Sequence, residues 1–147
     1  MRKLAGDLMS LYVRHKAGWR CWLENSLLGK CGSKNVWNEM QMAHIIGKGA
    51  HPAGRFIEQN VRCLCKRCHR YYTDRPEEWR EVLDKKIGEG AFQQLFNMTR
   101  VRQGRVDLKL EIFYWLRKLE ERDDLDKIQE RFDTLKKKAA KLGAAPW

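Results

Sequence analysis

Long apolar runs are missing from this 147-residue chain: no stretch approaches the roughly 20 consecutive apolar residues that a membrane-spanning helix requires. The first 16 residues are charged and contain no apolar centre, so they do not have the pattern of a secretory signal peptide. These absences predict a soluble protein that works in the cytoplasm and has no membrane partner.

Acidic residues are scarce relative to basic ones, with 19 Asp and Glu against 30 Lys and Arg, and the formal net charge is +11. The excess lies in residues 1–106, which hold 20 basic and 10 acidic side chains, whereas residues 107–147 hold 10 and 9. A surplus of this kind suits a polyanion such as nucleic acid, although a solvated basic surface needs no partner. Charge alone therefore leaves nucleic-acid binding open.

Cysteine occurs only between residues 21 and 68, where all five cysteines lie. Without a secretory signal a disulfide framework is not expected, and clustered cysteines in a reducing compartment are typical of metal sites. Cys65 and Cys68 are two residues apart, which presents both sulfurs to one ion. Cys21 and Cys31 are the candidates for the remaining two ligands of a tetrahedral zinc site, and free buried thiols are the alternative. Cys63 is expected to be a packed thiol.

Hydrophobic periodicity predicts two short strands among several helices. The predicted strands cover residues 36–43, with His44 at the end, and residues 60–64, and a glycine-rich loop separates them. The predicted helices cover residues 3–16, a short segment from Cys68 onward, residues 75–88 with Pro76 in the first turn, and residues 91–98.

The last forty residues carry apolar side chains at steps of three and four in two blocks, 108–119 and 125–142, with Asp123 and Asp124 between them. This pattern predicts two packed helices or one long helix with a phase slip. We expect the first block, which contains the bulkiest residues, to dock on the finger that the hairpin and its cysteines form. The second block is a candidate for pairing with a second copy as a homodimer, and a helical hairpin within a monomer is the alternative.

Three residues stand in the order His, Asn, His: His44 after the first strand, Asn60 before the second, and His69 directly after Cys68. With the segments MQMAHIIGKG and GRFIEQNVRCLCKRCHRYYTDRPEEW around them, the chain resembles the HNH, or ββα-metal, endonuclease superfamily. It is especially similar to the phage-borne branch that includes the NinG/Rap-type recombination nucleases. The resemblance covers residues 20–96.

The resemblance implies an α+β fold in which a zinc-stapled ββα-metal finger is embedded in a mainly helical small domain. Residues 1–100 would form this HNH nuclease domain together with the N-terminal helix. Residues 101–147 would form a helical C-terminal extension. A phage-encoded nuclease of this kind would act in the cytoplasm of a bacterial host cell.

The implied activity is metal-dependent hydrolysis of DNA phosphodiester bonds, in duplex or branched DNA. His44 is the candidate general base, because a neutral imidazole suits the removal of a proton from water. By the resemblance, His69 binds a catalytic Mg²⁺ or Mn²⁺ ion beside the scissile phosphate, and Asn60 ties the loop so that His44 is aimed. The arginines expected to contact DNA are Arg55, Arg62, Arg67, Arg70 and Arg75.

Ala43 departs from the pattern of the superfamily, in which many members carry Asp or His immediately before the base as a second ligand of the ion. Gln41, Glu39 or His51 could substitute, or His69 and the phosphate could hold the ion with water. Two other functions therefore stay open. One is a zinc-stapled DNA-binding protein with weak or no catalysis, and the other is an interaction module whose tail recruits a partner.

Overall fold

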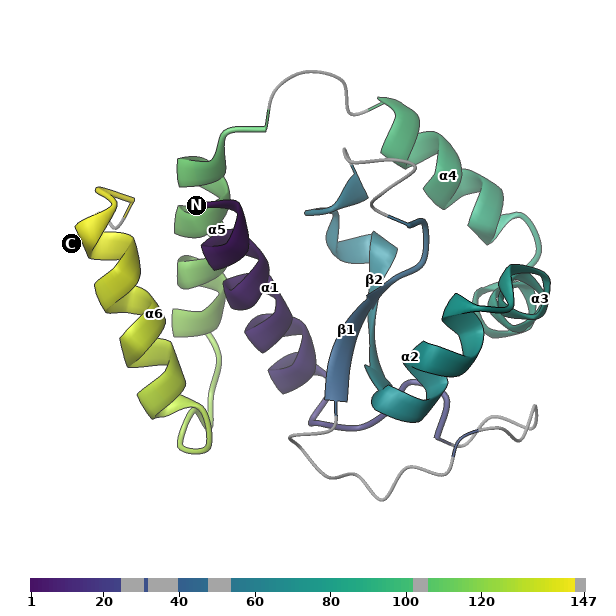
Figure 1. Cartoon of the computed structure of the whole chain (residues 1–147), viewed down its shortest axis with the longest axis horizontal. Coiled ribbons are helices and arrows are strands. Elements are labelled where there is room, and N and C mark those ends of the chain that lie inside the picture. The colour runs from purple at the N-terminus through teal and green to yellow at the C-terminus, as the bar shows by residue number, and fades with distance from the viewer. Residues whose placement is uncertain (25–30, 32–39, 48–53, 102–105, 145–147) are drawn as a thin grey trace. The chain divides into compact units, whose positions relative to one another are not determined.

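The computed structural model describes residues 1–24, 31, 40–47, 54–101 and 106–144. Within these ranges the fold is mixed α+β, as predicted, with six α-helices, a short 3-10 helix and one two-stranded antiparallel sheet. Every helix in these ranges is too short or too polar to cross a lipid bilayer. In chain order the elements are α1 (Arg2–Lys16), β1 (Met40–His44), η3 (Glu58–Asn60), β2 (Val61–Cys65), α2 (Lys66–Thr73), α3 (Pro76–Ile87), α4 (Ala91–Val101), α5 (Leu108–Glu120) and α6 (Gln129–Lys141) (Figure 1).

The chain divides into two compact units. Unit 1 combines Met1–Lys16 with Gly104–Trp147, and unit 2 is the continuous segment Ala17–Gln103. The sequence also predicted a boundary near residue 100, but it grouped the N-terminal helix with the nuclease domain. In the structure α1 packs on α5 and α6, and the apolar side chains of the three helices bury one another.

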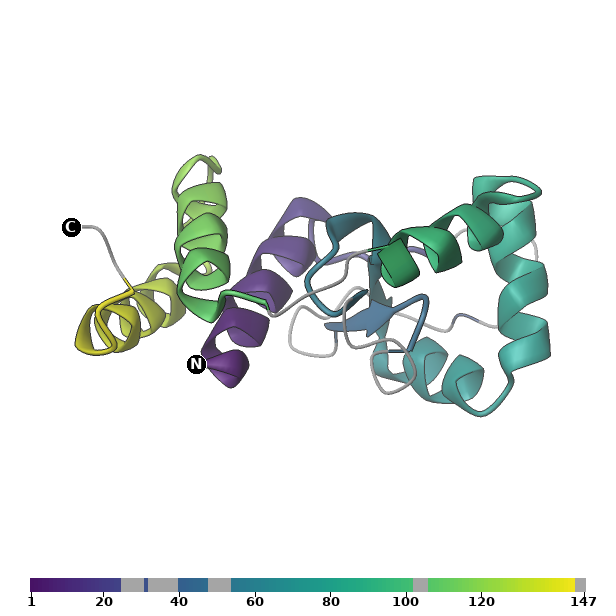
Figure 2. The ribbon, with the colours of Figure 1, turned by 90° about the horizontal axis from the view of Figure 1, so that it is seen from above.

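Unit 1 is a cluster of three helices in which α1 contacts both α5 and α6 (Figure 2). Its centre is aromatic and aliphatic: the rings of Tyr12 and Trp115 have centroids 5.4 Å apart, and Leu8 and Trp115 are completely buried. Asp107 caps the start of α5 by accepting hydrogen bonds from the next backbone N–H groups, those of Lys109 and Leu110.

The C-terminal tail consists of two helices separated by a turn, which is one of the two predicted arrangements. Four of the apolar residues in the second block are buried inside unit 1: Ile128, Phe132, Leu135 and Ala139. The homodimer through the C-terminal helices was predicted because these side chains were expected to be exposed. The chain's own helices cover them, so this reason for a homodimer does not hold. The first block was expected to dock on the finger, and in the structure it packs on α1 within unit 1.

Unit 2 contains an antiparallel hairpin in which Met40 lies opposite Cys65 and His44 lies opposite Val61. His44 ends β1, as predicted, and residues 36–39 of the predicted strand lie outside the described residues. Helix α2 follows β2 directly and contacts both strands. It begins at Lys66, earlier than predicted, because the Cys65 sulfur caps its first turn.

Helices α3 and α4 complete unit 2 and pack against each other. The prediction for α3 is correct within one residue at each end: Pro76 stands in its first turn, and Gly88, with φ of +98°, follows its last residue. Helix α4 runs three residues beyond its predicted end.

Candidate functional site

Four cysteine sulfurs converge in unit 2, and all of them lie within 4.8 Å of one another. They are the predicted set: Cys21, Cys31, Cys65 and Cys68. Zinc with four Zn–S bonds of about 2.3 Å separates its sulfurs by roughly 3.8 Å, and the sulfurs of Cys31 and Cys65 are 4.0 Å apart. No disulfide joins any of the five cysteines, all of which the structure describes. The cluster has the size and chemistry to hold a metal ion such as zinc.

Local structure explains how these sulfurs meet. Cys65 ends β2 and Cys68 lies in the first turn of α2, so an abrupt change from strand to helix puts both on one side. The loop that carries Cys21 is tied to the same strand, because the backbone N–H of Trp22 donates to the carbonyl of Cys63 at 2.8 Å. Cys63 itself is buried and is not a member of the cluster, in line with its prediction as a packed thiol.

Cys21 and Cys68 in this cluster have pKa values shifted in opposite directions. A hydrogen bond from the Cys68 thiol lowers the pKa of Cys21 to about 5, although burial acts in the opposite direction. The same hydrogen bond and burial raise the pKa of Cys68. One sulfur of the pair is therefore a thiolate at neutral pH, and an incoming cation would displace the proton of the other.

Asn60 is completely buried and uses its side-chain amide to join the two ends of the loop between the strands. Its Oδ1 accepts a hydrogen bond from the N–H of Ile46 at 2.8 Å, and its Nδ2 donates to the carbonyls of Ile46 and Gly54 at 3.1 Å each. The backbone N–H of Ile45 donates to the carbonyl of Asn60 at 2.7 Å. Asn60 thus fixes the backbone that directly follows His44.

A close approach at Gly54 adds a second restraint on this loop. A Cβ atom at residue 54 would lie 2.6 Å from Cγ2 of Thr99 and 3.0 Å from Nδ2 of Asn60, so a larger side chain does not fit without a shift. Thr99 belongs to α4 and is 2% exposed. Helix α4 therefore braces the loop through a contact that no local pattern predicts, since Gly54 and Thr99 are 45 positions apart.

His44 is half-buried, and its Nε2 lies 2.9 Å from the carbonyl oxygen of Arg55. A carbonyl only accepts, so Nε2 carries the proton and the lone pair of the neutral ring is on Nδ1. The loop that Asn60 and Thr99 restrain thus sets both the orientation and the tautomer of His44. A ring held in this way has the chemistry to take up a proton.

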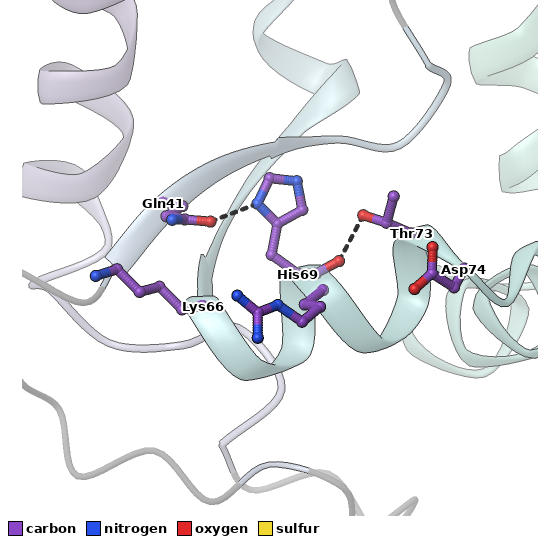
Figure 3. Close-up of a pocket in the computed structure, with 6 residues that line it drawn as sticks. Gln41, Lys66, His69, Thr73 and Asp74 are labelled. Atoms are coloured by element: carbon purple, nitrogen blue, oxygen red, sulfur yellow. Dashed lines mark hydrogen bonds between the residues drawn. The ribbon is translucent and has the colours of Figure 1, made fainter.

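His69 lies on α2, and its Nδ1 is 2.8 Å from Oε1 of Gln41 on β1. Both residues line an open pocket of about 520 Å³, together with Lys66, Arg70, Thr73 and Asp74 (Figure 3). Ala43 lies two residues after Gln41 and so shares its side of the strand, and it is buried. Of the three substitutes predicted for the missing ligand at Ala43, Glu39 and His51 lie outside the described residues.

The five predicted DNA-binding arginines differ in how they are engaged. Arg62 is half-buried, donates to the carbonyls of Gln59 and Val61, and lies 5.0 Å from the ring of Trp22, and burial lowers its pKa. Arg75 lies 4.0 Å from the ring of Tyr71. These two have intramolecular partners, as does the backbone carbonyl of Arg55.

Arg67 and Arg70 are exposed on α2, and Arg70 borders the pocket. Lys66 also borders the pocket, although it was not among the residues predicted to contact DNA. Its position one residue after the strand-ending Cys65 was the available signal, because the first residue of a helix that packs on the hairpin lies close to the hairpin's end.

A scan against protein-family models matched none, and searches of curated proteins and of solved structures returned no match.

Proposed function

We propose that this protein is a metal-dependent endonuclease of the HNH type that hydrolyses phosphodiester bonds in DNA. The observation that carries the proposal is the side chain of Asn60, whose three hydrogen bonds hold the loop that orients His44. A buried amide whose oxygen and NH₂ group both bond to one loop makes that loop rigid. The order of β1, β2 and α2, with His44, Asn60 and His69 on or beside them, supports the same reading.

In this proposal His44 is the general base. Its Nδ1 takes a proton from water as the water oxygen attacks phosphorus. The imidazolium that results is stabilised by the hydrogen bond that its Nε2 donates to the carbonyl of Arg55. The bond from phosphorus to the 3′ oxygen breaks as the new bond forms. Asn60 acts through His44 and does not touch the substrate.

His69 would bind a divalent ion, Mg²⁺ or Mn²⁺, which offsets the charge that builds up on the phosphoryl group and the departing oxygen. The four-cysteine cluster would hold a separate, structural Zn²⁺ ion. Its place next to α2 supports this division of roles, because Cys68 and His69 are adjacent and a fixed Cys68 fixes the start of the helix that carries His69.

DNA is the substrate class that the charge supports. Lys66 and Arg70 border the pocket of His69, and Arg67 is exposed on the same helix, so α2 presents basic side chains beside the proposed catalytic ion. A phage-encoded enzyme that acts on branched recombination intermediates in the bacterial cytoplasm is the biological role that fits the resemblance.

A plasmid-nicking assay tests the proposal. Supercoiled plasmid is incubated with the protein in Mg²⁺, Mn²⁺ or EDTA, beside the variant His44→Ala. We expect the variant to be about 10²–10⁴ times slower, with unchanged zinc content and DNA affinity, because a general base contributes to the transition state more than to ground-state binding.

His15→Ala is the matched control, because His15 lies on α1 in unit 1, and this variant should cut at the parental rate. If His44→Ala cuts as fast as the parent, the base assignment is wrong. Duplex, flap and four-way-junction substrates in the same assay would establish the preferred DNA structure.

A zinc-stapled DNA-binding protein without catalysis is a second candidate, and Ala43 favours it. This buried alanine offers no ligand atom on the side of β1 that faces His69. Salt-dependent DNA binding with no cleavage in either ion would support this candidate. A protein that neither cuts nor binds DNA would instead favour the interaction module.

A further inference from the structure

The pocket beside His69 is bordered along α2 by side chains of both charges. Lys66 is the first residue of the helix, Arg70 lies about one turn later, and Asp74 directly follows the last helical residue. The three are spaced four residues apart, so they lie on one side of α2. Figure 3 shows Lys66 and Asp74 on opposite sides of His69.

The other polar groups of the pocket are bonded to one another. Oε1 of Gln41 lies 2.8 Å from Nδ1 of His69, and Oγ1 of Thr73 donates to the carbonyl of His69 at 2.6 Å. Lys66, Arg70 and Asp74 are exposed, and within the described part of the chain their side chains form no ion pair or hydrogen bond. The charged side chains are therefore the groups of this pocket that a ligand can engage.

The stability of α2 does not account for this order of charges. The helix dipole favours acidic side chains in the first turn and basic side chains in the last. Helix α3 follows this rule, with two glutamates in its first turn and two lysines in its last. Helix α2 begins with Lys66, has no acidic residue in its first turn and is followed by Asp74. The two ends of the pocket thus carry the charges that the helix itself favours least.

A nucleotide has groups that match both ends of this pocket. Its phosphate is an anion that Lys66 and Arg70 can bind, and a carboxylate such as that of Asp74 accepts hydrogen bonds from a base. Guanine is the base whose Watson–Crick edge has two adjacent donors, N1–H and the N2 amino group, and a carboxylate can accept from both.

The dimensions of the pocket agree with such a ligand. The eight residues from Lys66 to Asp74 cover roughly 12 Å along the helix axis, which is comparable to the length of a nucleotide from its phosphate to the far edge of its base. The volume of about 520 Å³ is more than a phosphate group alone needs and is typical of sites for small molecules.

We propose that this pocket is a subsite for one unpaired nucleotide of the DNA, with its phosphate at Lys66 and Arg70 and a guanine base at the carboxylate of Asp74. The inference rests on the proposed function in one respect, that the ligand is DNA. It adds a preference for a guanine outside the double helix, because base pairing would occupy the edge that Asp74 contacts.

The first test measures the choice of base. Zinc-loaded protein without Mg²⁺ or Mn²⁺ is titrated into labelled oligothymidylates in which one central thymine is kept or replaced by guanine, adenine or cytosine, and fluorescence anisotropy gives the affinity. The guanine oligonucleotide should bind about 5-fold or more tightly than the others. Asp74→Asn should abolish this preference without weakening the binding of plain oligothymidylate. Asp126→Asn, at an exposed aspartate of unit 1, is the control that should keep it.

The second test measures the contact with the phosphate. Lys66→Gln and Arg70→Gln should each weaken the binding of all four oligonucleotides by a similar factor and keep the preference for guanine. Each should also reduce the slope of log affinity against log salt concentration by about 0.7, the value for one phosphate contact on a single strand. Lys137→Gln, at an exposed lysine of α6, is the matched control and should keep the parental slope.

The outcomes separate this inference from the nuclease proposal. Equal affinity for the four bases overturns the inference, as does a guanine preference that survives in Asp74→Asn or a salt slope that Lys66→Gln and Arg70→Gln leave unchanged. A parent protein that cuts plasmid but shows no choice of base contradicts the inference alone. A parent that prefers guanine through Asp74 but cuts no DNA contradicts the nuclease proposal and supports the inference.

Discussion

In unit 1, the helices α1, α5 and α6 meet over fully buried side chains such as Leu8, Trp115 and Leu135. In unit 2, the centre of the hairpin region holds four converging cysteines and a buried amide, that of Asn60. Net charge does not separate the units, since unit 1 has 15 basic and 10 acidic residues and unit 2 has 15 and 9. The two regions therefore differ in what holds them together more than in what attracts them to a polyanion.

The difference matters because the two kinds of core respond differently to change. Apolar packing is spread over many contacts and needs no cofactor, so a loss at one residue is limited to that residue's burial and cavity. A thiolate cluster and a hydrogen-bonded amide depend on every member being present. His44 and His69, the proposed catalytic residues, lie in the unit with the second kind of core.

Removing a thiolate from unit 2 tests this difference between the two cores with the largest expected effect. Cys65→Ser keeps a side chain that can cap α2 but removes a metal ligand. Structural zinc in small domains contributes about 10–16 kcal/mol at neutral pH, so we expect loss of zinc and unfolding of unit 2, with the helices of unit 1 retained. Zinc analysis and residue-resolved NMR would measure both effects.

Cys63→Ala is the control for that experiment, because Cys63 is buried outside the cluster, and the variant should keep its zinc. A parent protein stripped of metal that remains well folded, with a single metal-independent melting transition, would contradict the role of the cluster as a staple.

A cavity in unit 1 tests whether its apolar core tolerates the loss of one side chain. Leu135→Ala removes a completely buried side chain from α6 and should lower the free energy of unfolding of unit 1 by about 2–5 kcal/mol. Zinc content should stay the same. Denaturant unfolding followed by circular dichroism gives the stability, and Leu142→Ala, at a residue 41% exposed on the same helical tail, is the matched control with little expected effect.

The bracing of the loop in unit 2 gives a smaller effect that can be tested with a double mutant. Gly54→Ala should cost about 1–3 kcal/mol and disturb the ring of His44, because the new Cβ would stand too close to Thr99. Thr99→Ser removes the nearest atom, Cγ2, and should recover part of the loss in the double variant.

Gly47→Ala is the control at this loop, since a Cβ there meets nothing within 4 Å. A Gly54→Ala protein as stable as the Gly47→Ala protein would show that the loop and α4 are not coupled in the way the close contact indicates.

Local patterns predicted the parts of the site that local chemistry determines. The two-residue spacing of Cys65 and Cys68 indicated a metal pair, and the structure brings the predicted partners Cys21 and Cys31 to it. The position of His44 at a strand end was also readable, because alternation and a following glycine-rich loop mark where a strand stops. The Cys65–Cys68 pair and the end of the strand depend on neighbours within a few residues, whereas Cys21 and Cys31 were only the remaining candidates for the same ion.

Features that depend on distant neighbours were not readable. The sequence placed Gln41 only among possible ligands, since nothing local shows that its amide meets His69. It selected Arg62 as a phosphate contact, and nothing local shows that the guanidinium of Arg62 lies over the ring of Trp22, 40 residues earlier. It also grouped α1 with the hairpin, whereas α1 lies in the compact unit of α5 and α6, because an amphipathic helix carries no sign of which apolar face will cover it.

The division of unit 1 between two distant segments has a consequence for biosynthesis. A ribosome adds about 5–20 residues per second, so α1 is complete roughly 5–20 s before α5, its main partner, has been made. Over that interval Leu8 and Met9, both completely buried in the finished protein, have no native surface to cover them. Unit 2 is continuous in the chain and can fold first, so the nascent protein passes through a stage in which the cysteine cluster is assembled and the apolar face of α1 is uncovered. This is the stage at which a chaperone would bind.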